Sequence, residues 1–266
     1  MLKDITIGQF IRGDSIIHRA DPRTKIALTF LYIISIFFIK NIVLYVIPAI
    51  YLAIVIYLSK IPFKIFLGNL RPLRALLIIT FILNIFFAAG DTVLLSWRFI
   101  VITKEGLDLA LHFSFRLVFL IIGSSILTLT TSPVSISDGI ESFLKPLKKI
   151  KFPVHELAMM MTIALRFIPT LMEETDKIMK AQISRGADFD SGNIFEKAKS
   201  MIPLLVPLFI SAFRRANDLA MAMEARCYHG DENRTRYRLL KFSLVDFYCI
   251  FASILYFVLI IYTSKL

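Results

Sequence analysis

Long apolar blocks alternate with charged segments along the chain, and the blocks predict membrane-spanning helices. The first block, Ile26–Leu58, is interrupted only by Lys40-Asn41. A straight helix of that length would measure about 50 Å, well beyond the roughly 30 Å hydrocarbon core of a bilayer. We therefore expect a hairpin of two spans that turns at Lys40-Asn41. Three further spans are predicted at Ala75–Ala89, Leu107–Leu129 and Leu244–Tyr262.

The distribution of basic residues predicts how these spans are oriented. Of the 31 Lys and Arg residues, 26 lie in the N-terminal tail, in the loop between the second and third spans, or in segment 131–242. Cytoplasmic loops of membrane proteins carry an excess of Lys and Arg. We therefore expect a multi-pass protein of the cell membrane with a cytoplasmic N-terminus and an extracellular C-terminus.

Segment 131–242 is predicted to form a helical domain outside the membrane. It contains 17 basic and 13 acidic residues, and a loop of this length without secondary structure is uncommon. Two long helices are expected, from about Val154 to Arg185 and from about Ile194 to Arg226, with turn-forming residues 188–193 between them. A short basic helix is expected at Leu147–Phe152. The alternative is that the apolar halves of the long helices form another membrane hairpin, which would make seven spans.

The predicted fold is therefore all-α and has three parts. Residues 1–130 hold the N-terminal tail and four spans, residues 131–242 form the cytoplasmic domain, and residues 243–266 form the fifth span. The composition agrees, because 57% of the residues are hydrophobic against about 45–50% in soluble domains. Membrane topology explains most of the net charge of +11, so we expect lipid and no nucleic acid as a partner.

The two long helices of segment 131–242 end in similar sequences 41 residues apart. Ser184-Arg185-Gly186 aligns with Ala225-Arg226-Cys227, and the apolar positions before them keep the same phase. An Arg at such a position can simply complement the helix dipole, and a Gly can cap the helix. Two equivalent Arg side chains also suit two equivalent binding sites on a partner with approximate two-fold symmetry.

Motifs for nucleotide binding and catalysis are absent from the sequence. Gly8 and Gly13 have the P-loop spacing, but Asp14-Ser15 follows where Lys and Ser or Thr are required. No H-E-x-x-H zinc motif and no G-x-S-x-G nucleophile motif occurs. We therefore expect that the chain is not an enzyme and has no catalytic residue, no metal ligand and no cofactor of its own.

Asp108, His112 and Arg116 share one face of the fourth span, with Arg116 near its middle. Ionisable groups in a membrane span are costly and point to a function. The trio is expected either to contact another subunit or to form an internal pair that stabilises the bundle. It also carries the alternative function of a self-sufficient secondary transporter. A membrane-embedded enzyme would need clustered carboxylates or His at one depth, which the sequence lacks outside this trio.

The segment directly before the first span contains Asp21-Pro22-Arg23 and Lys25. Asp is a preferred helix N-cap and Pro is favoured at the first helical position. The motif therefore predicts the start of a helix. A fixed contact with the two long cytoplasmic helices is the other interpretation, and the two are compatible.

Three stretches of the sequence carry a resemblance to a known family, namely Gly8-Gln9-Phe10 with Asp14–Lys25, Ala181–Gly186 and Ala222–Tyr228. Together they resemble the transmembrane (T) component of energy-coupling factor transporters, the EcfT/CbiQ family of ABC-type importers. The resemblance covers essentially the full length. Two residues of the Arg motifs depart from the family pattern. Ser184 replaces the usual Ala, and Cys227 replaces the usual Gly, which makes Gly230 a second candidate for the end of that helix.

The resemblance implies a subunit that couples ATP hydrolysis to the uptake of vitamins or of metals such as cobalt and nickel. The two long helices would be coupling helices, and Arg185 and Arg226 would each insert into a groove of one of two ATP-binding cassette ATPase subunits. ATP would be bound by those partners. The membrane helices would hold a small substrate-binding (S) membrane subunit, so that the chain itself never binds the substrate.

Overall fold

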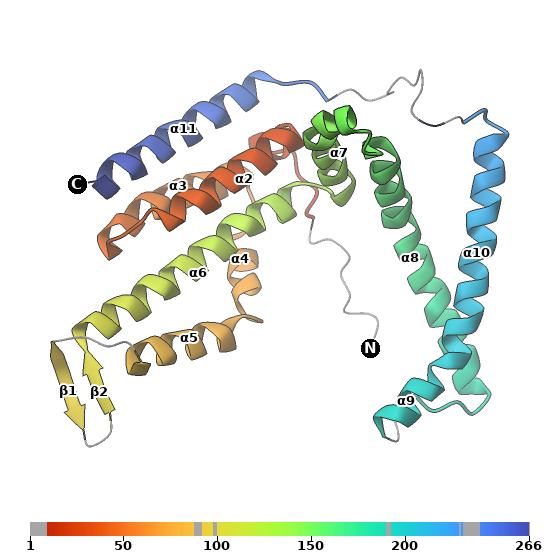
Figure 1. Ribbon diagram of the computed structural model, residues 1–266, viewed down its shortest axis with the longest axis horizontal. Coiled ribbons are helices and arrows are strands. Elements are labelled where there is room, and N and C mark those ends of the chain that lie inside the picture. Colours follow the sequence, from red (N-terminus) through yellow and green to blue (C-terminus); the bar gives the residue numbers. More distant parts are fainter. Residues whose placement is uncertain are drawn as a thin grey trace. The chain divides into compact units, whose positions relative to one another are not determined.

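A computed structural model describes residues 10–87, 92–97, 100–189, 193–228, 230 and 240–265. Within these residues the chain is helical as predicted, apart from one small β-hairpin (Figure 1). Its contacts divide it into two compact units. The first unit comprises Gly8–Gly139 and Leu240–Leu266, and the second contains Ile140–Leu239. Gly8-Gln9 of the N-terminal motif and turn residues 190–192 lie outside the described residues.

The first unit contains the helices that the apolar blocks predict. The predicted turn at Lys40-Asn41 is confirmed, because one helix ends at Phe37 and the next begins at Ile42. The elements are α1 (Ile16–Arg19), α2 (Pro22–Phe37), the 3-10 helix η2 (Ile42–Tyr45), α3 (Val46–Ser59), α4 (Phe63–Leu70), α5 (Arg74–Phe87), α6 (Lys104–Thr130) and α11 (Leu244–Lys265).

The described helices agree with a polytopic membrane protein of about five spans. Four segments are long and apolar enough to cross a membrane, and α4 with α5 makes a fifth if their 61° bend lies within one broken span. With 16 residues, α2 is about 24 Å long and shorter than a usual span. α8 qualifies by length and composition, so the choice between five and seven spans stays a prediction. The four segments are Ile42–Ser59, Lys104–Thr130, Val154–Ser184 and Leu244–Ser264.

Aromatic stacking holds the helices of the first unit together. Tyr32 of α2, Tyr51 of α3 and Tyr256 of α11 form a cluster with ring centroids 4.3 to 6.0 Å apart. On its other side, Tyr32 packs so closely on α6 that a Cβ at Gly123 would lie 2.1 Å from the ring. Many large apolar side chains remain exposed, Phe251 of α11 among them. Exposed apolar surface of this kind suits helices that face lipid.

A β-hairpin between α5 and α6 replaces the plain loop expected between the third and fourth spans. Strand β1 (Val93–Trp97) pairs antiparallel with β2 (Ile100–Thr103), with an irregularity in register between Val93 and Leu95. Each strand is a short apolar run, and such runs cannot be assigned to strand or helix by periodicity alone.

The second unit contains the two long helices, and their bounds correct two expectations. The second long helix breaks at Met201 into α9 and α10, so a continuous helix from about Ile194 to Arg226 is wrong. Pro203 explains the break, because it has no N–H to donate to the carbonyl four residues earlier. Helix α7, which begins in the first unit, was not expected. The elements are α7 (Pro133–Leu144), the 3-10 helix η3 (Lys145–Ile150), α8 (Val154–Ser184), α9 (Ile194–Ser200) and α10 (Ile202–Glu224).

Candidate functional site

Helix α8 ends in a Schellman motif built around Gly186. The N–H of Gly186 donates to the carbonyl oxygen of Ile183 at 2.9 Å, and the N–H of Ala187 donates to that of Gln182 at 3.0 Å. Gly186 has a φ of 86°, in the left-handed region where glycine is favoured. Arg185 is the last residue before this reversal, so its side chain leaves the helix at its tip.

Helix α10 ends in the same motif, 41 residues further on. The N–H of Cys227 donates to the carbonyl oxygen of Glu224 at 2.9 Å, and the N–H of Tyr228 donates to that of Met223 at 3.1 Å. Cys227 has a φ of 55° and takes the place of the glycine. The alternative helix end at Gly230 is therefore wrong. A side chain in the left-handed region costs about 1–2 kcal/mol, so the second cap is the strained one.

The two Arg motifs are exposed and have equivalent backbones. Neither Arg185 nor Arg226 forms a side-chain hydrogen bond or ion pair with another described residue. The hydroxyl of Ser184 donates to the carbonyl oxygen of Lys180 at 3.0 Å. The hydroxyl group that Ser184 adds in place of the usual Ala therefore has its hydrogen-bond partner within the helix. The exposed residues are Ser184, Arg185, Gly186, Ala225, Arg226 and Cys227.

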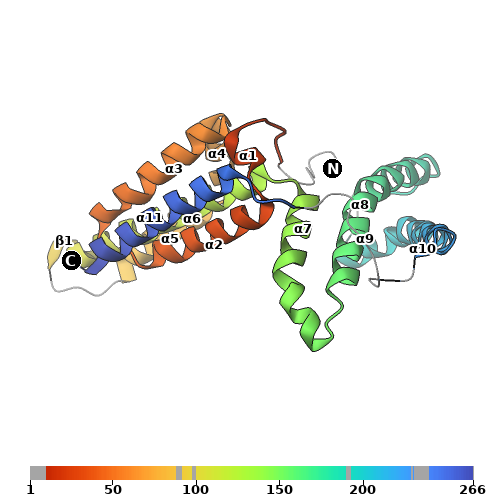
Figure 2. The ribbon, with the colours of Figure 1, turned by 90° about the horizontal axis from the view of Figure 1, so that it is seen from above.

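Helices α8 and α10 run in opposite directions and lie side by side within the second unit (Figures 1 and 2). One carboxylate of α8 joins them. The hydroxyl of Ser211 donates to Oε1 of Glu174, and Nη2 of Arg215 donates to Oε2 of Glu174 at 2.9 Å. Ser211 and Arg215 lie four residues apart and so share one face of α10. Both oxygens of the carboxylate are therefore held by the same partner helix.

Sequence reasoning missed this contact between the two helices. Glu174 stands among other charged residues, such as Glu173 and Asp176, which suggest only a solvated helix face. The signal that could have found it is the sequence repeat, because the 41-residue offset aligns Glu174 with Arg215 (215 − 174 = 41). Opposite charges at equivalent positions of two helices are candidates for a pair.

The motif before α2 forms a helix start, as predicted. The carboxylate of Asp21 accepts a hydrogen bond from the N–H of Arg23 at 2.9 Å, and Pro22 is the first residue of α2. Nζ of Lys25 donates to the carbonyl oxygens of His18 and Thr130 at 3.1 Å each. Lys25 therefore ties α2 to α1 and to the end of α6. The contact of this motif with the coupling helices stays a prediction.

A second buried carboxylate, which sequence reasoning did not single out, supports this motif. The side chain of Asp246 accepts hydrogen bonds from the N–H of Asp21 at 2.7 Å, the N–H of Ser243 at 2.7 Å and the hydroxyl of Ser243 at 3.0 Å. Asp246 is only 1% exposed. It joins the first turns of α2 and α11, two helices far apart in the sequence.

The structure brings together two of the three ionisable residues of α6. Nη2 of Arg116 donates to Nε2 of His112 at 2.9 Å, and the hydroxyl of Tyr45 donates to the carbonyl oxygen of His112 at 3.2 Å. The guanidinium carbon of Arg116 lies 5.2 Å from the ring centroid of Phe37. Arg116 lies near the middle of α6 (Lys104–Thr130), as predicted, and its guanidinium packs on the last residue of α2. Asp108 is exposed and has no hydrogen bond to this pair, and a role in subunit contact stays a prediction.

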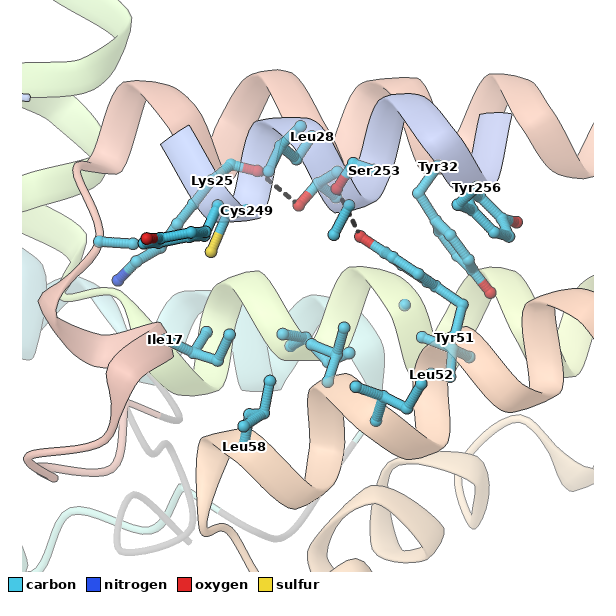
Figure 3. A pocket seen from close by; sticks show the side chains of 18 of the residues that line it. Ile17, Lys25, Leu28, Tyr32, Tyr51, Leu52, Leu58, Cys249, Ser253 and Tyr256 are labelled. Carbon is cyan, nitrogen blue, oxygen red and sulfur yellow. Dashed lines mark hydrogen bonds between the residues drawn. The ribbon is translucent and has the colours of Figure 1, made fainter. Parts of the chain in front are cut away.

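An apolar cavity of about 800 Å³ lies between α1, α2, α3, α6 and α11 (Figure 3). Lys25 and Cys249 lie at one end, and the three stacked tyrosines lie at the other. The hydroxyl groups of Tyr51 and Ser253 are 2.8 Å apart and hydrogen-bonded. The ammonium group of Lys25 is occupied by the two carbonyl oxygens already described. These polar groups thus serve the packing of the helices, and the remaining lining is predominantly apolar.

Comparison with known proteins identifies the family to which this chain belongs. The chain matches the CbiQ family, described as cobalt transport protein, over residues 13–237. The chain belongs to this family. The "Energy-coupling factor transporter transmembrane protein EcfT" of Clostridium kluyveri is 56% identical over 248 residues, which cover 93% of this chain and 92% of that protein.

Other relatives of the same name cover nearly all of the chain. The protein of Lactococcus lactis subsp. cremoris is 47% identical over 264 residues, covering 99% of both chains, and that of Bacillus subtilis is 46% identical over 246 residues, covering 92% of this chain and 93% of that protein. The resemblance inferred from the motifs is thereby confirmed. The protein is the transmembrane component of an energy-coupling factor transporter.

Proposed function

We propose that this subunit transmits the energy of ATP hydrolysis from two partner ABC ATPases to a separate, small substrate-binding membrane subunit. The observation that carries the proposal is the pair of equivalent helix ends, each exposing one Arg, at Arg185 and Arg226. Arg stays charged, pairs with carboxylates through two hydrogen bonds and stacks on aromatic rings. It is enriched among the residues that dominate binding energy in interfaces. Two such ends match a partner with two equivalent sockets.

In this proposal each subunit has its own task. The partners bind ATP, because the sequence has no P-loop, and this chain contributes neither catalysis nor a cofactor. The membrane unit contacts lipid and the substrate-binding subunit through its exposed apolar side chains. The coupling helices and the N-terminus face the cytoplasm and the C-terminus faces outward, as the basic residues suggest. The cargo is a vitamin or a transition metal ion.

No observation favours a self-sufficient secondary transporter. Such a protein needs polar groups that converge on a substrate within the membrane. Of the candidate trio, His112 and Arg116 bond to each other and Asp108 is exposed without joining them. The trio therefore does not form a convergent site.

Purification of the complex tests the proposed function. The tagged chain, co-expressed with its partners, is purified in mild detergent and analysed by mass spectrometry and ATPase assay. We expect two ATPase chains and one small membrane protein to co-elute. Replacing an interface hot spot costs about 2 kcal/mol or more, which is roughly 30-fold in affinity. Arg185→Ala/Arg226→Ala should therefore lose the ATPases and keep the small membrane protein.

The matched control is Arg214→Ala, which removes another exposed Arg of α10 outside the Arg motif. This variant should retain the ATPases at the wild-type level. Retention of the ATPases by the variant that lacks both Arg185 and Arg226 would refute the proposed role of the helix ends.

A further inference from the structure

The coupling helices α8 and α10 touch at equivalent positions of the sequence repeat. The offset that aligns Arg185 with Arg226 (226 − 185 = 41) also aligns Glu174 with Arg215 (215 − 174 = 41). Glu174 and Arg215 are themselves in contact, with 2.9 Å between Oε2 and Nη2. Each helix therefore meets the other eleven residues before its own terminal Arg (185 − 174 = 11 and 226 − 215 = 11).

This spacing makes the two arms from contact to tip equivalent. Eleven residues of α-helix rise about 16 Å and complete about three turns. Each Arg therefore lies at the same distance from the contact and near the same helix face. Because α8 and α10 run in opposite directions (Figure 1), the arms extend to opposite sides. A residue that meets its own counterpart marks the position of a two-fold axis, here a local and approximate one.

We propose that the contact of Glu174 with Arg215 is the pivot about which the coupling helices rotate against each other. The inference rests on the proposed function, in which closing of the ATPase pair moves the two tips. With equal arms, a rotation at this point displaces both tips equally, as two symmetric partners require. Identical charges would repel at such an axis. The pairing of an acid with a base keeps the geometry symmetric while making the contact attractive.

The chemistry of the contact suits a pivot better than a stabilising bridge. The side chains of Glu174 and Arg215 are 23% and 39% exposed, and ion pairs that water reaches contribute little to stability. The hydroxyl of Ser211 donates to the second oxygen of Glu174, so two residues of α10 fix the orientation of the Glu174 carboxylate. Glu174 and Arg215 are thus positioning residues, and their loss is expected to alter the angle between the helices and not their folding.

The test measures the distance between spin labels on the two arms in the assembled complex. Lys180 and Met221 are exposed and equivalent (221 − 180 = 41), six residues beyond the pivot on each arm (180 − 174 = 6). Both are changed to Cys in a background with Cys227→Gly and Cys249→Ser, and pulsed electron paramagnetic resonance is recorded without and with ATP. Lys180→Cys and Met221→Cys leave the terminal Arg side chains in place.

With the pivot intact, we expect a narrow distance distribution that shifts when ATP is added. Residues in contact are energetically coupled, so Glu174→Arg should reduce the shifted population about two-fold or more. The exchange Glu174→Arg/Arg215→Glu should restore the shift. Glu173→Arg makes the same change of charge at the exposed neighbouring residue and should leave the shift unchanged.

Failure of the pivot and failure of the proposed function give different results. Co-purification of the ATPases is followed in every variant. If the ATPases stay bound and Glu174→Arg shifts as the wild type does, or if the exchange does not restore a lost shift, the pivot is overturned. If the ATPases do not bind a chain with an intact pivot and both terminal Arg residues, the proposed function itself is wrong.

Discussion

Exchanging the left-handed residue of each helix cap tests whether the two Arg-bearing ends are equivalent. A side chain at such a position costs about 1–2 kcal/mol. Replacing Gly by Ala recovers about 0.4–1 kcal/mol, because the unfolded chain becomes less flexible. A Cβ at Gly186 would meet no atom within 4 Å, so no steric clash adds to this. We therefore expect Gly186→Ala to destabilise the end of α8 by about 0.5–1 kcal/mol and Cys227→Gly to stabilise the end of α10 by a similar amount.

Hydrogen exchange of the purified protein, followed by mass spectrometry, measures these changes locally. The N–H groups of Gly186 and Ala187 and those of Cys227 and Tyr228 are bonded within the caps, so they exchange when the caps open. A change of 1 kcal/mol alters the opening equilibrium about five-fold. After correction for intrinsic rates, exchange should accelerate in Gly186→Ala and slow in Cys227→Gly.

A glycine with ordinary helical geometry provides the control. Gly68 lies inside α4, and a Cβ there also meets nothing within 4 Å. Since Ala is about 1 kcal/mol better than Gly in a helix, Gly68→Ala should slow exchange in α4, opposite in sign to Gly186→Ala. Slower exchange in Gly186→Ala, or faster exchange in Cys227→Gly, would refute the reasoning from cap geometry.

Two further substitutions test the packing of the first unit. Asp246→Asn removes the charge of a buried carboxylate that accepts three hydrogen bonds, each worth about 1.5–3 kcal/mol when made to a charged group, and should lower the thermal unfolding temperature in detergent. Asp108→Asn, at an exposed position, should not, and equal temperatures for both variants would contradict the role of Asp246. Gly123→Ala forces a Cβ against the Tyr32 ring and should destabilise by about 1–3 kcal/mol. Gly68→Ala is its control, and a Gly123→Ala protein as stable as the wild type would argue against this close packing of α2 on α6.

The sequence predicted those parts of the fold that depend on neighbouring residues. The turn at Lys40-Asn41 follows from the length of the apolar block, and the start of α2 follows from Asp21-Pro22. The break at Met201 is also local, because it follows from Pro203. It could have been predicted, but the apolar periodicity on both sides suggested one continuous helix. Cys227 stands at a glycine position, which made Gly230 a second candidate for the helix end. That candidate is wrong because a Schellman motif tolerates a strained residue when its hydrogen bonds are kept.

The sequence by itself determined where most of the apolar helices lie, where α8 ends, and that Arg185 and Arg226 share one phase. These features depend on interactions within a few residues and on apolar length. Only the tertiary structure decided that Asp246 bonds to Asp21, 225 residues away, that Arg116 packs on Phe37, and that Glu174 meets Arg215. Such contacts depend on how separate helices pack, and many side chains of suitable charge compete for each partner. Helix packing thus brings Glu174 and Arg215, which are equivalent positions of the sequence repeat, into contact. Each of them lies eleven residues before the Arg at the end of its own helix.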